Sequence, residues 1–269
     1  MKSTRFRGRK PLLALSAAAA AATLVLGLGT SAEAAPALNP DPIPSSFDFS
    51  DCPPLPEGSD PGFSHCFTVV VTSGTFNVGN FEQTIDEPIR MTFAQAFNLS
   101  TFQFTNVFGK FRAPKMLVQP GLFGDPFLSA VYARPEYAGV FDLPSSTDYK
   151  IKLGLKIRLI NPVLGSNCTV GSDSNPIVLN FTTGTTSPPA PNTPITGEPA
   201  TVVRSDPPPS VRSAKHVENS FAVPGAKGCL FGGGVADWLV NQIGGFPSAA
   251  GHNTMIQNEY IVEKSYSDL

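Results

Sequence analysis

The sequence has few charged residues, few histidines and no motif that holds a metal ion, and each shortage argues against a class of protein. Charged residues make up 15% of the 269 residues, and acidic residues outnumber basic ones by 21 to 19. A nucleic-acid partner is not expected, because phosphate binding needs a basic surface. The three histidines and four cysteines lack the spacing of Cys-x-x-Cys or Cys/His ligand sets. We therefore expect neither a metal site nor a cofactor.

Motifs of hydrolytic enzymes are also missing. The chain has no Gly-x-Ser-x-Gly elbow, and no alternation of strands with helices that would support one. A catalytic triad can still be assembled in space, which leaves His65, His216 and His252 as candidates for a general base. His252 is the most suggestive because small residues surround it, although a turn histidine that bonds a backbone carbonyl is the preferred interpretation.

Paired acids and oxygen-rich turns give weak signals for a glycosidase or a calcium site. Asp86 and Glu87 are adjacent beside a proline, in a turn where acids face water. Glu259 and Glu263 share one strand face but lie about 13 Å apart at the strand rise, beyond the roughly 5–9.5 Å that glycosidases use. The turn at 171–175 supplies oxygen atoms for calcium, yet Ser, Asp and Asn are ordinary turn formers. We expect no catalytic residue and no metal ligand among them.

The N-terminal region has the three parts of a removable secretory signal. Basic residues between Lys2 and Lys10 precede an apolar run at 12–29, and Ala32-Glu33-Ala34 supplies the small-x-small pattern that signal peptidase reads. We therefore expect residues 1–34 to be a cleaved signal peptide and the mature chain to be secreted. No later apolar run is long enough to span a bilayer, so the mature chain is expected to have no transmembrane segment.

An even set of cysteines in an exported chain predicts disulfides. Three pairings are possible among Cys52, Cys66, Cys168 and Cys229. We favour Cys52–Cys66 with Cys168–Cys229, because each pair then lies in its own part of the chain. On the loop-entropy model the shorter loop contributes roughly 3 kcal/mol and the longer one roughly 4 kcal/mol.

Alternating apolar residues predict antiparallel strands. In the clearest case, 150–159, one face carries Ile151, Leu153, Leu155, Ile157 and Leu159, and the other carries Lys150, Lys152, Lys156 and Arg158. A period of two is typical of a half-buried strand. Shorter candidates lie at 67–72, 75–78, 89–93, 129–133, 177–181, 213–223 and 254–264. Turn signals separate them, which favours an all-β antiparallel β-sandwich, immunoglobulin-like or jelly-roll-like.

We place the β-sandwich domain at 47–269. One proline-rich segment precedes this domain and a second lies within it. Residues 35–46 are expected to be a flexible N-terminus. Prolines in 184–210 cannot join a central ladder, so this segment is either a crossover within one domain or a linker between two. The crossover is preferred, because the Cys168–Cys229 bridge would span it.

One short C-terminal helix is predicted. Val235, Trp238, Leu239 and Ile243 recur at helical spacing, and Gly244-Gly245 offers a C-terminal stop. At about ten residues, the helix is expected to plug one end of the sandwich.

Two surface features suggest binding rather than catalysis. Without residues 1–34, which hold five of the 19 basic and one of the 21 acidic residues, the chain keeps 14 basic and 20 acidic residues. In such an acidic chain, the cationic strand face of Lys150, Lys152, Lys156 and Arg158 could bind an anionic wall polymer, although a solvated outer face is the simpler interpretation. The aromatic run 97–104 could form an exposed platform, but burial in the core is preferred.

Several segments resemble a family of uncharacterised small secreted proteins of actinobacteria. They are 165–172 (GSNCTVGS), 176–179 (PIVL), 183–189 (TGTTSPP) and 246–253 (FPSAAGHN). The resemblance covers roughly 150–262, and it implies export, a disulfide at Cys168 and a bacterial source. It implies no reaction, cofactor or active-site residue.

Taken together, these patterns predict an exported, non-catalytic binding or structural module of the cell envelope or the medium. Its expected partner is a cell-wall polymer or another envelope component. The alternative is a secreted hydrolase of a polymer or lipid ester, with a site assembled across loops. A hydrolase would place one histidine within bonding reach of a serine and an acid, lining a pocket.

Overall fold

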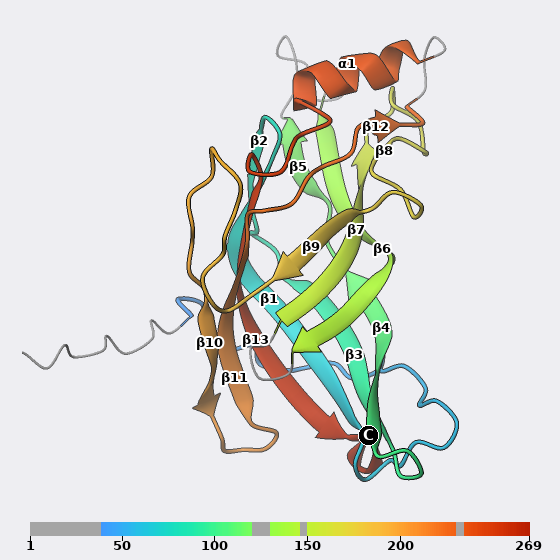
Figure 1. Ribbon diagram of the computed structural model, residues 1–269, viewed down its shortest axis with the longest axis vertical. Helices are drawn as coiled ribbons and strands as arrows, with labels where there is room; N and C mark the ends of the chain where they lie inside the picture. Colours follow the sequence, from blue (N-terminus) through green and yellow to red (C-terminus); the bar gives the residue numbers. More distant parts are fainter. Residues whose placement is uncertain (1–38, 120–129, 146–149, 230–233) are drawn as a thin grey trace, which may run out of the picture. The chain divides into compact units, whose positions relative to one another are not determined.

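The computed structural model describes residues 39–119, 130–145, 150–229 and 234–269 (Figure 1). The signal peptide predicted at residues 1–34 lies outside this range. In the described part of the chain, thirteen strands form two antiparallel sheets, and one α-helix lies near the C-terminus. The predicted all-β fold with a short C-terminal helix is confirmed.

The first sheet brings together strands from both ends of the chain. Its order is β10-β11-β13-β1-β3-β4, and β2 pairs with β1. The strands are β1 (His65–Val78), β2 (Phe81–Thr84), β3 (Ile89–Asn98), β4 (Gln103–Arg112), β10 (Glu198–Arg204), β11 (Val211–Glu218) and β13 (Thr254–Ser265). The long pairing of β1 with β13 runs from His65 opposite Ser265 to Asn77 opposite Thr254.

The second sheet is built around the predicted strand at 150–159. Its order is β12-β8-β7-β6-β5, and β9 pairs with β7. The strands are β5 (Met116–Gln119), β6 (Val131–Ser145), β7 (Lys150–Ile160), β8 (Thr169–Val170), β9 (Ile177–Phe181) and β12 (Ala226–Lys227). Helix α1 (Val235–Gly244) follows β12, and a short 3-10 helix, η1 (Tyr266–Asp268), follows β13.

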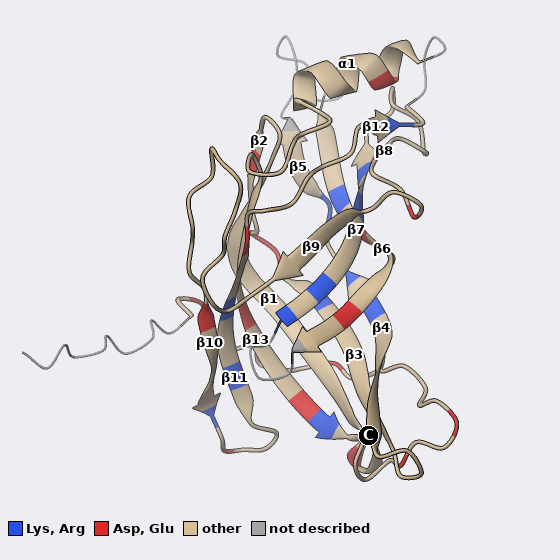
Figure 2. Cartoon of the chain, viewed as in Figure 1, with Lys and Arg blue, Asp and Glu red and all other residues tan. Residues whose placement is uncertain are grey.

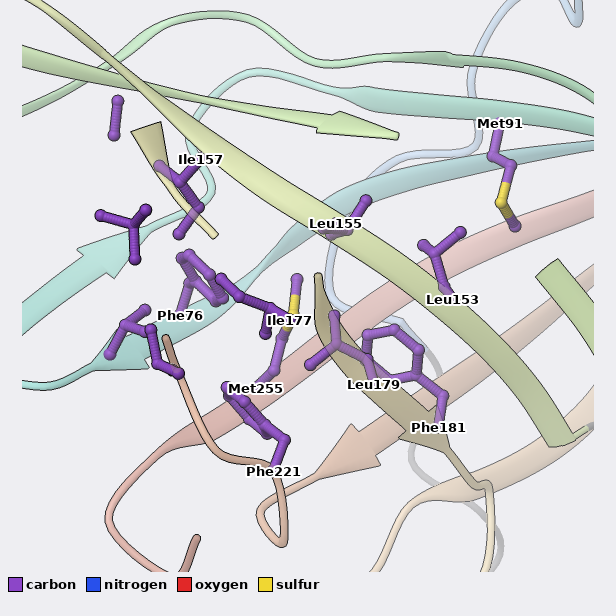
Figure 3. Close-up of a cluster of buried hydrophobic side chains, with 14 of the residues drawn as sticks. Phe76, Met91, Leu153, Leu155, Ile157, Ile177, Leu179, Phe181, Phe221 and Met255 are labelled. Atoms are coloured by element: carbon purple, nitrogen blue, oxygen red, sulfur yellow. The ribbon is translucent and has the colours of Figure 1, made fainter. Parts of the chain in front are cut away.

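The core lies between the two sheets. The five apolar residues predicted on one face of β7 are all buried: Ile151, Leu153, Leu155, Ile157 and Leu159. Figure 3 shows side chains of β7 and β9 meeting those of the first sheet, among them Leu155, Ile177, Leu179, Phe76 and Met255. Each such side chain contributes about 1.5–3 kcal/mol when it is fully buried, so this layer is the main source of stability.

The proline-rich segment 184–210 contains a strand that the sequence analysis did not predict. Strand β10 forms one edge of the first sheet and pairs with β11 alone. An edge strand needs hydrogen-bond donors on one side only, which is why it tolerates Pro199. The chain before it passes from β9 in the second sheet to β10 in the first.

The described part of the N-terminal segment packs on the outer face of the first sheet. Ile43, Phe47 and Phe49 contact the buried side chains of Val211, Tyr260 and Val262. The Tyr260 hydroxyl also donates a hydrogen bond to the Asp41 carbonyl at 2.5 Å. This described part of the segment therefore contacts the sheet through apolar packing and a hydrogen bond.

Both disulfides join the cysteines that the sequence analysis favoured. Cys52 bonds Cys66, and Cys168 bonds Cys229 across a separation of 61 residues. The second bridge lies beside the pairing of β8 with β12, where Thr169 is opposite Lys227. Two disulfides indicate that the protein folds in an oxidising environment.

Candidate functional site

An apolar cavity of about 240 Å³ lies at the α1 end of the sandwich, between the sheets and the helix. Strand residues of both sheets form its walls, and α1 contributes Leu239, Val240 and Ile243. The strand residues that line it are Phe76, Val78, Phe81, Gln83, Met116, Val118, Val131, Ala133, Pro135, Ile157, Leu159 and Val170, joined by Asn161, Val163, Leu164 and Phe246. No charged side chain is among these described lining residues, so the cavity fits an apolar ligand.

The polar side chains at the cavity wall are engaged elsewhere. The Asn161 amide donates to the Ala130 carbonyl at 2.8 Å and accepts the Val163 N–H at 2.7 Å. The Gln83 amide donates to the Thr84 carbonyl at 3.0 Å. These bonds occupy part of the hydrogen-bonding capacity of each amide.

Helix α1 is fixed over the cavity by hydrogen bonds along its length. The Asn241 amide accepts the Ala226 N–H at 2.6 Å and donates to the Ala226 carbonyl at 3.2 Å. The Asp237 carboxylate accepts the Cys229 N–H at 2.8 Å. At the C-terminal end, the Asn80 N–H donates to the Gly244 carbonyl at 2.9 Å. The helix is thus tied to β12, to the Cys168–Cys229 bridge and to the β1–β2 turn.

The predicted helix and its glycine stop are confirmed, and the apolar residues that predicted it are largely exposed. Gly245 ends the helix in the left-handed conformation, with φ of 65°. Trp238, Leu239 and Ile243 are 60%, 50% and 42% exposed. Helix α1 contacts the end of the sandwich along one side only. Its apolar residues extend beyond that side, so some of them stay exposed.

One of the three candidate histidines forms a buried pair with an acid. His216 Nδ1 lies 2.8 Å from Glu259 Oε1, and the two side chains are 1% and 2% exposed. Residues far apart in the sequence meet here because β11 and β13 are neighbours, with His216 opposite Gln257. A second cavity of about 170 Å³ between the sheets is lined by His216, Arg212 and Glu263.

The other histidines and acids do not converge. His252 is exposed in a turn, and its backbone N–H donates to the Ala249 carbonyl at 3.3 Å. His65 begins β1, opposite Ser265 and Gln95. Glu263, considered with Glu259 as a pair of catalytic acids, instead forms an ion pair with Arg212 at 3.1 Å.

The remaining candidate acids lie at the surface. Asp86 and Glu87 are exposed. In the turn at 171–175, Asp173 forms an ion pair with Lys156. Across the described residues, no group of three or more His, Cys, Asp or Glu side chains is placed to hold a metal ion.

The cationic strand face is partly neutralised by ion pairs. Lys156 Nζ lies 2.7 Å from Asp173 Oδ1, and Arg158 holds Glu136 with two bonds of 2.7 and 3.0 Å. Figure 2 shows acidic segments on β6 beside the basic ones of β7. Lys152 lies opposite Asp142 across the same strand pair. Of the predicted polymer-binding residues, Lys156 and Arg158 are thus engaged within the protein.

The Glu136 carboxylate should make the stability of the folded protein depend on pH. Burial disfavours its charged form, but hydrogen bonds from Arg158 and Arg134 outweigh burial and lower the pKa of Glu136 below its ordinary value of 4.5. A lowered pKa stabilises the fold above pH 4.5, and this stabilisation is lost as the pH falls through the lowered pKa. We expect Glu136→Gln to lose less stability than the wild type between pH 6 and pH 3, measured by urea unfolding. Parallel pH profiles for the two proteins would contradict this assignment.

The preference for burying the aromatic run 97–104 in the core is wrong. Phe102 and Phe104 are 76% and 61% exposed. They pack with Phe63 around Phe97, with ring centroids 4.9–6.2 Å from it. The β3–β4 hairpin extends past the second sheet (Figure 1), so no facing layer reaches these rings.

Comparisons with known proteins identify no relative of this chain. A scan of protein families, a search of curated proteins and a search of solved structures each found no match. In the described part of the chain, no helix is long and apolar enough to cross a membrane.

Proposed function

We propose that this protein is an exported, non-catalytic binding module that holds an apolar ligand in the cavity beneath α1. The observation that carries the proposal is the uncharged, almost wholly apolar wall of a cavity of about 240 Å³. Ligand sites are typically apolar concavities with a few polar groups. Here Gln83 and Asn161 are the only polar side chains among the described lining residues, which favours a ligand recognised by its hydrocarbon part.

The cavity volume limits the size of that hydrocarbon part. A protein cavity of about 150 Å³ holds benzene, so by the same ratio a cavity of about 240 Å³ holds roughly ten carbon atoms. An alkyl chain suits the site better than a charged metabolite. Leu239 and Ile243 line the cavity and are half-exposed, so the polar end of such a ligand would face the solvent beside them.

A series of straight-chain 1-alkanols tests this proposal by calorimetric titration. Each buried CH₂ contributes about 0.8 kcal/mol, so the affinity should rise about fourfold per carbon and level off near ten carbons. Ala133→Leu places about three extra carbon atoms in the cavity, and it should shift this limit to shorter chains by about three carbons.

Ala222→Leu is the matched control, because Ala222 is exposed and outside the cavity lining. It should leave the chain-length limit unchanged. An affinity that does not depend on chain length, or a limit that Ala133→Leu does not move, would rule out binding in this cavity.

The hydrolase alternative has one observation in its favour, the buried His216–Glu259 pair. An acid that orients a histidine is two-thirds of a catalytic triad. Hydrolysis of p-nitrophenyl esters that is lost in Glu259→Gln, with the fold retained, would support this alternative. Absence of turnover with short and long acyl chains would reject the hydrolase alternative in favour of the binding module.

A further inference from the structure

Helix α1 leaves several large apolar side chains exposed. Val235 and Trp238 are 62% and 60% exposed and do not line the cavity, whereas Leu239, 50% exposed, lies at the edge between the surface and the cavity wall. Ala236 and Val240 pack against the core. The three exposed residues follow the i, i+3, i+4 spacing of one helix face. This outer face therefore groups three large apolar side chains, with the uncharged Gln242 exposed one turn further along the same face.

The outer face also carries no charge. Asp237 is the one charged residue of α1, and its carboxylate is occupied by the Cys229 N–H. Figure 2 shows the rest of the helix without acidic or basic residues. Such a face complements neither an anionic nor a cationic surface, and it fits an uncharged apolar one.

The size of the face argues against a second copy or a globular partner. A helix of ten residues is about 15 Å long and about 10 Å wide. Its footprint of about 150 Å² is far below the roughly 800 Å² per partner of a stable protein interface. A lipid bilayer has no such requirement, because side chains enter it without a matching shape, and tryptophan favours the membrane–water interface.

We propose that the outer face of α1 inserts into the headgroup region of an uncharged, zwitterionic lipid bilayer. The purpose of this docking rests on the function proposed above: Leu239 and Ile243 belong both to the cavity wall and to the exposed surface. Docking would place the mouth of the cavity against the lipid, so that an alkyl chain passes between bilayer and cavity with little exposure to water.

The fluorescence of Trp238 tests the docking directly, because this is the sole tryptophan in the sequence. The probe is the processed, secreted protein mixed with phosphatidylcholine vesicles. We expect the Trp238 emission to shift to shorter wavelength, and phosphatidylcholine with brominated chains to quench it. Unchanged emission at all lipid concentrations would overturn the proposal.

A charge on the outer face should abolish docking without touching the cavity. Val235→Glu puts a carboxylate on the strip, and burying it next to lipid should weaken vesicle binding by about tenfold or more. The change suits the first turn of a helix, where a negative charge is favourable, and Val235 does not line the cavity. Val202→Glu on β10, where Val202 is 57% exposed, is the matched control and should bind vesicles like the wild type. Equal binding by the two variants would contradict the assignment to α1.

The same samples separate this proposal from the cavity function. Alkanol binding in vesicle-free solution with no vesicle response would reject docking and keep the ligand site. Vesicle binding without alkanol binding would keep docking and reject the ligand site. A blue-shifted Trp238 emission that grows with protein concentration in the absence of lipid would show that a second copy covers α1, and would overturn the choice of a bilayer.

Discussion

Replacing Cys168 and Cys229 together with serine is expected to lower the melting temperature by about 8–16 °C. The bridge closes a loop across 61 residues, and the loop-entropy model assigns such a closure about 4 kcal/mol. For a chain of this size, each kcal/mol corresponds to about 2–4 °C. Differential scanning calorimetry of the double variant against the wild type measures the change.

This double variant should also weaken ligand binding in the cavity beneath α1. Cys229 donates its N–H to Asp237 in the first turn of α1, and the bridge lies beside the pairing of β8 with β12. Cys52→Ser with Cys66→Ser is the control, because it opens a loop across 14 residues, for which the model predicts about 3 kcal/mol, and leaves the α1 anchor intact. An unchanged melting temperature in the Cys168/Cys229 variant would count against the bridge.

Replacing Glu259 by alanine is expected to destabilise the protein by about 3 kcal/mol. Glu259 is 2% exposed and is bonded to His216, which is 1% exposed. Removing one partner of a buried polar pair takes a hydrogen bond from the other, here from His216 Nδ1, in a place that water does not reach. Glu259→Gln keeps an acceptor for the imidazole and should cost less. Urea unfolding followed by circular dichroism gives the differences.

Glu263→Ala provides the matched comparison on the same strand face. The side chains of Glu263 and its partner Arg212 are 35% and 26% exposed, so water replaces the lost interaction. The expected cost is below about 1 kcal/mol. Similar losses for Glu259→Ala and Glu263→Ala would mean that burial does not set the strength of the His216–Glu259 pair.

Local patterns were sufficient for β1, β7, β9, β11, β13 and α1, but they gave no candidate for β2, β4, β5, β8 or β12 and only the start of β6. The alternation of residues 150–159 predicted β7 and its buried face, because a strand between core and solvent must alternate. Helical spacing of the apolar residues predicted α1, and Gly244-Gly245 predicted its end, because both signals are local. In contrast, β10 was missed because Pro199 and the prolines around the strand hide a strand that pairs on one side only.

The candidate site was harder to predict than the fold. Its lining residues come from both sheets and from α1, and apart from Gln83 and Asn161 they read in the sequence as ordinary core residues. The pairing of His216 with Glu259 depends on β11 and β13 being neighbours, which no local spacing reveals. A candidate histidine could be named in advance, but its partner could not.

The sequence by itself determined the period of the strands, the helix and its end, and the favoured disulfide pairing, because these depend on residues near one another or on an even set of cysteines. The tertiary structure alone decided which apolar faces are covered. Leu155 on β7 is buried by the facing sheet, whereas Trp238 on α1 and Phe102 beyond β3 lie where no second layer reaches. Periodicity shows that a face is apolar, but burial requires a second surface, and the position of that surface depends on contacts between distant parts of the chain.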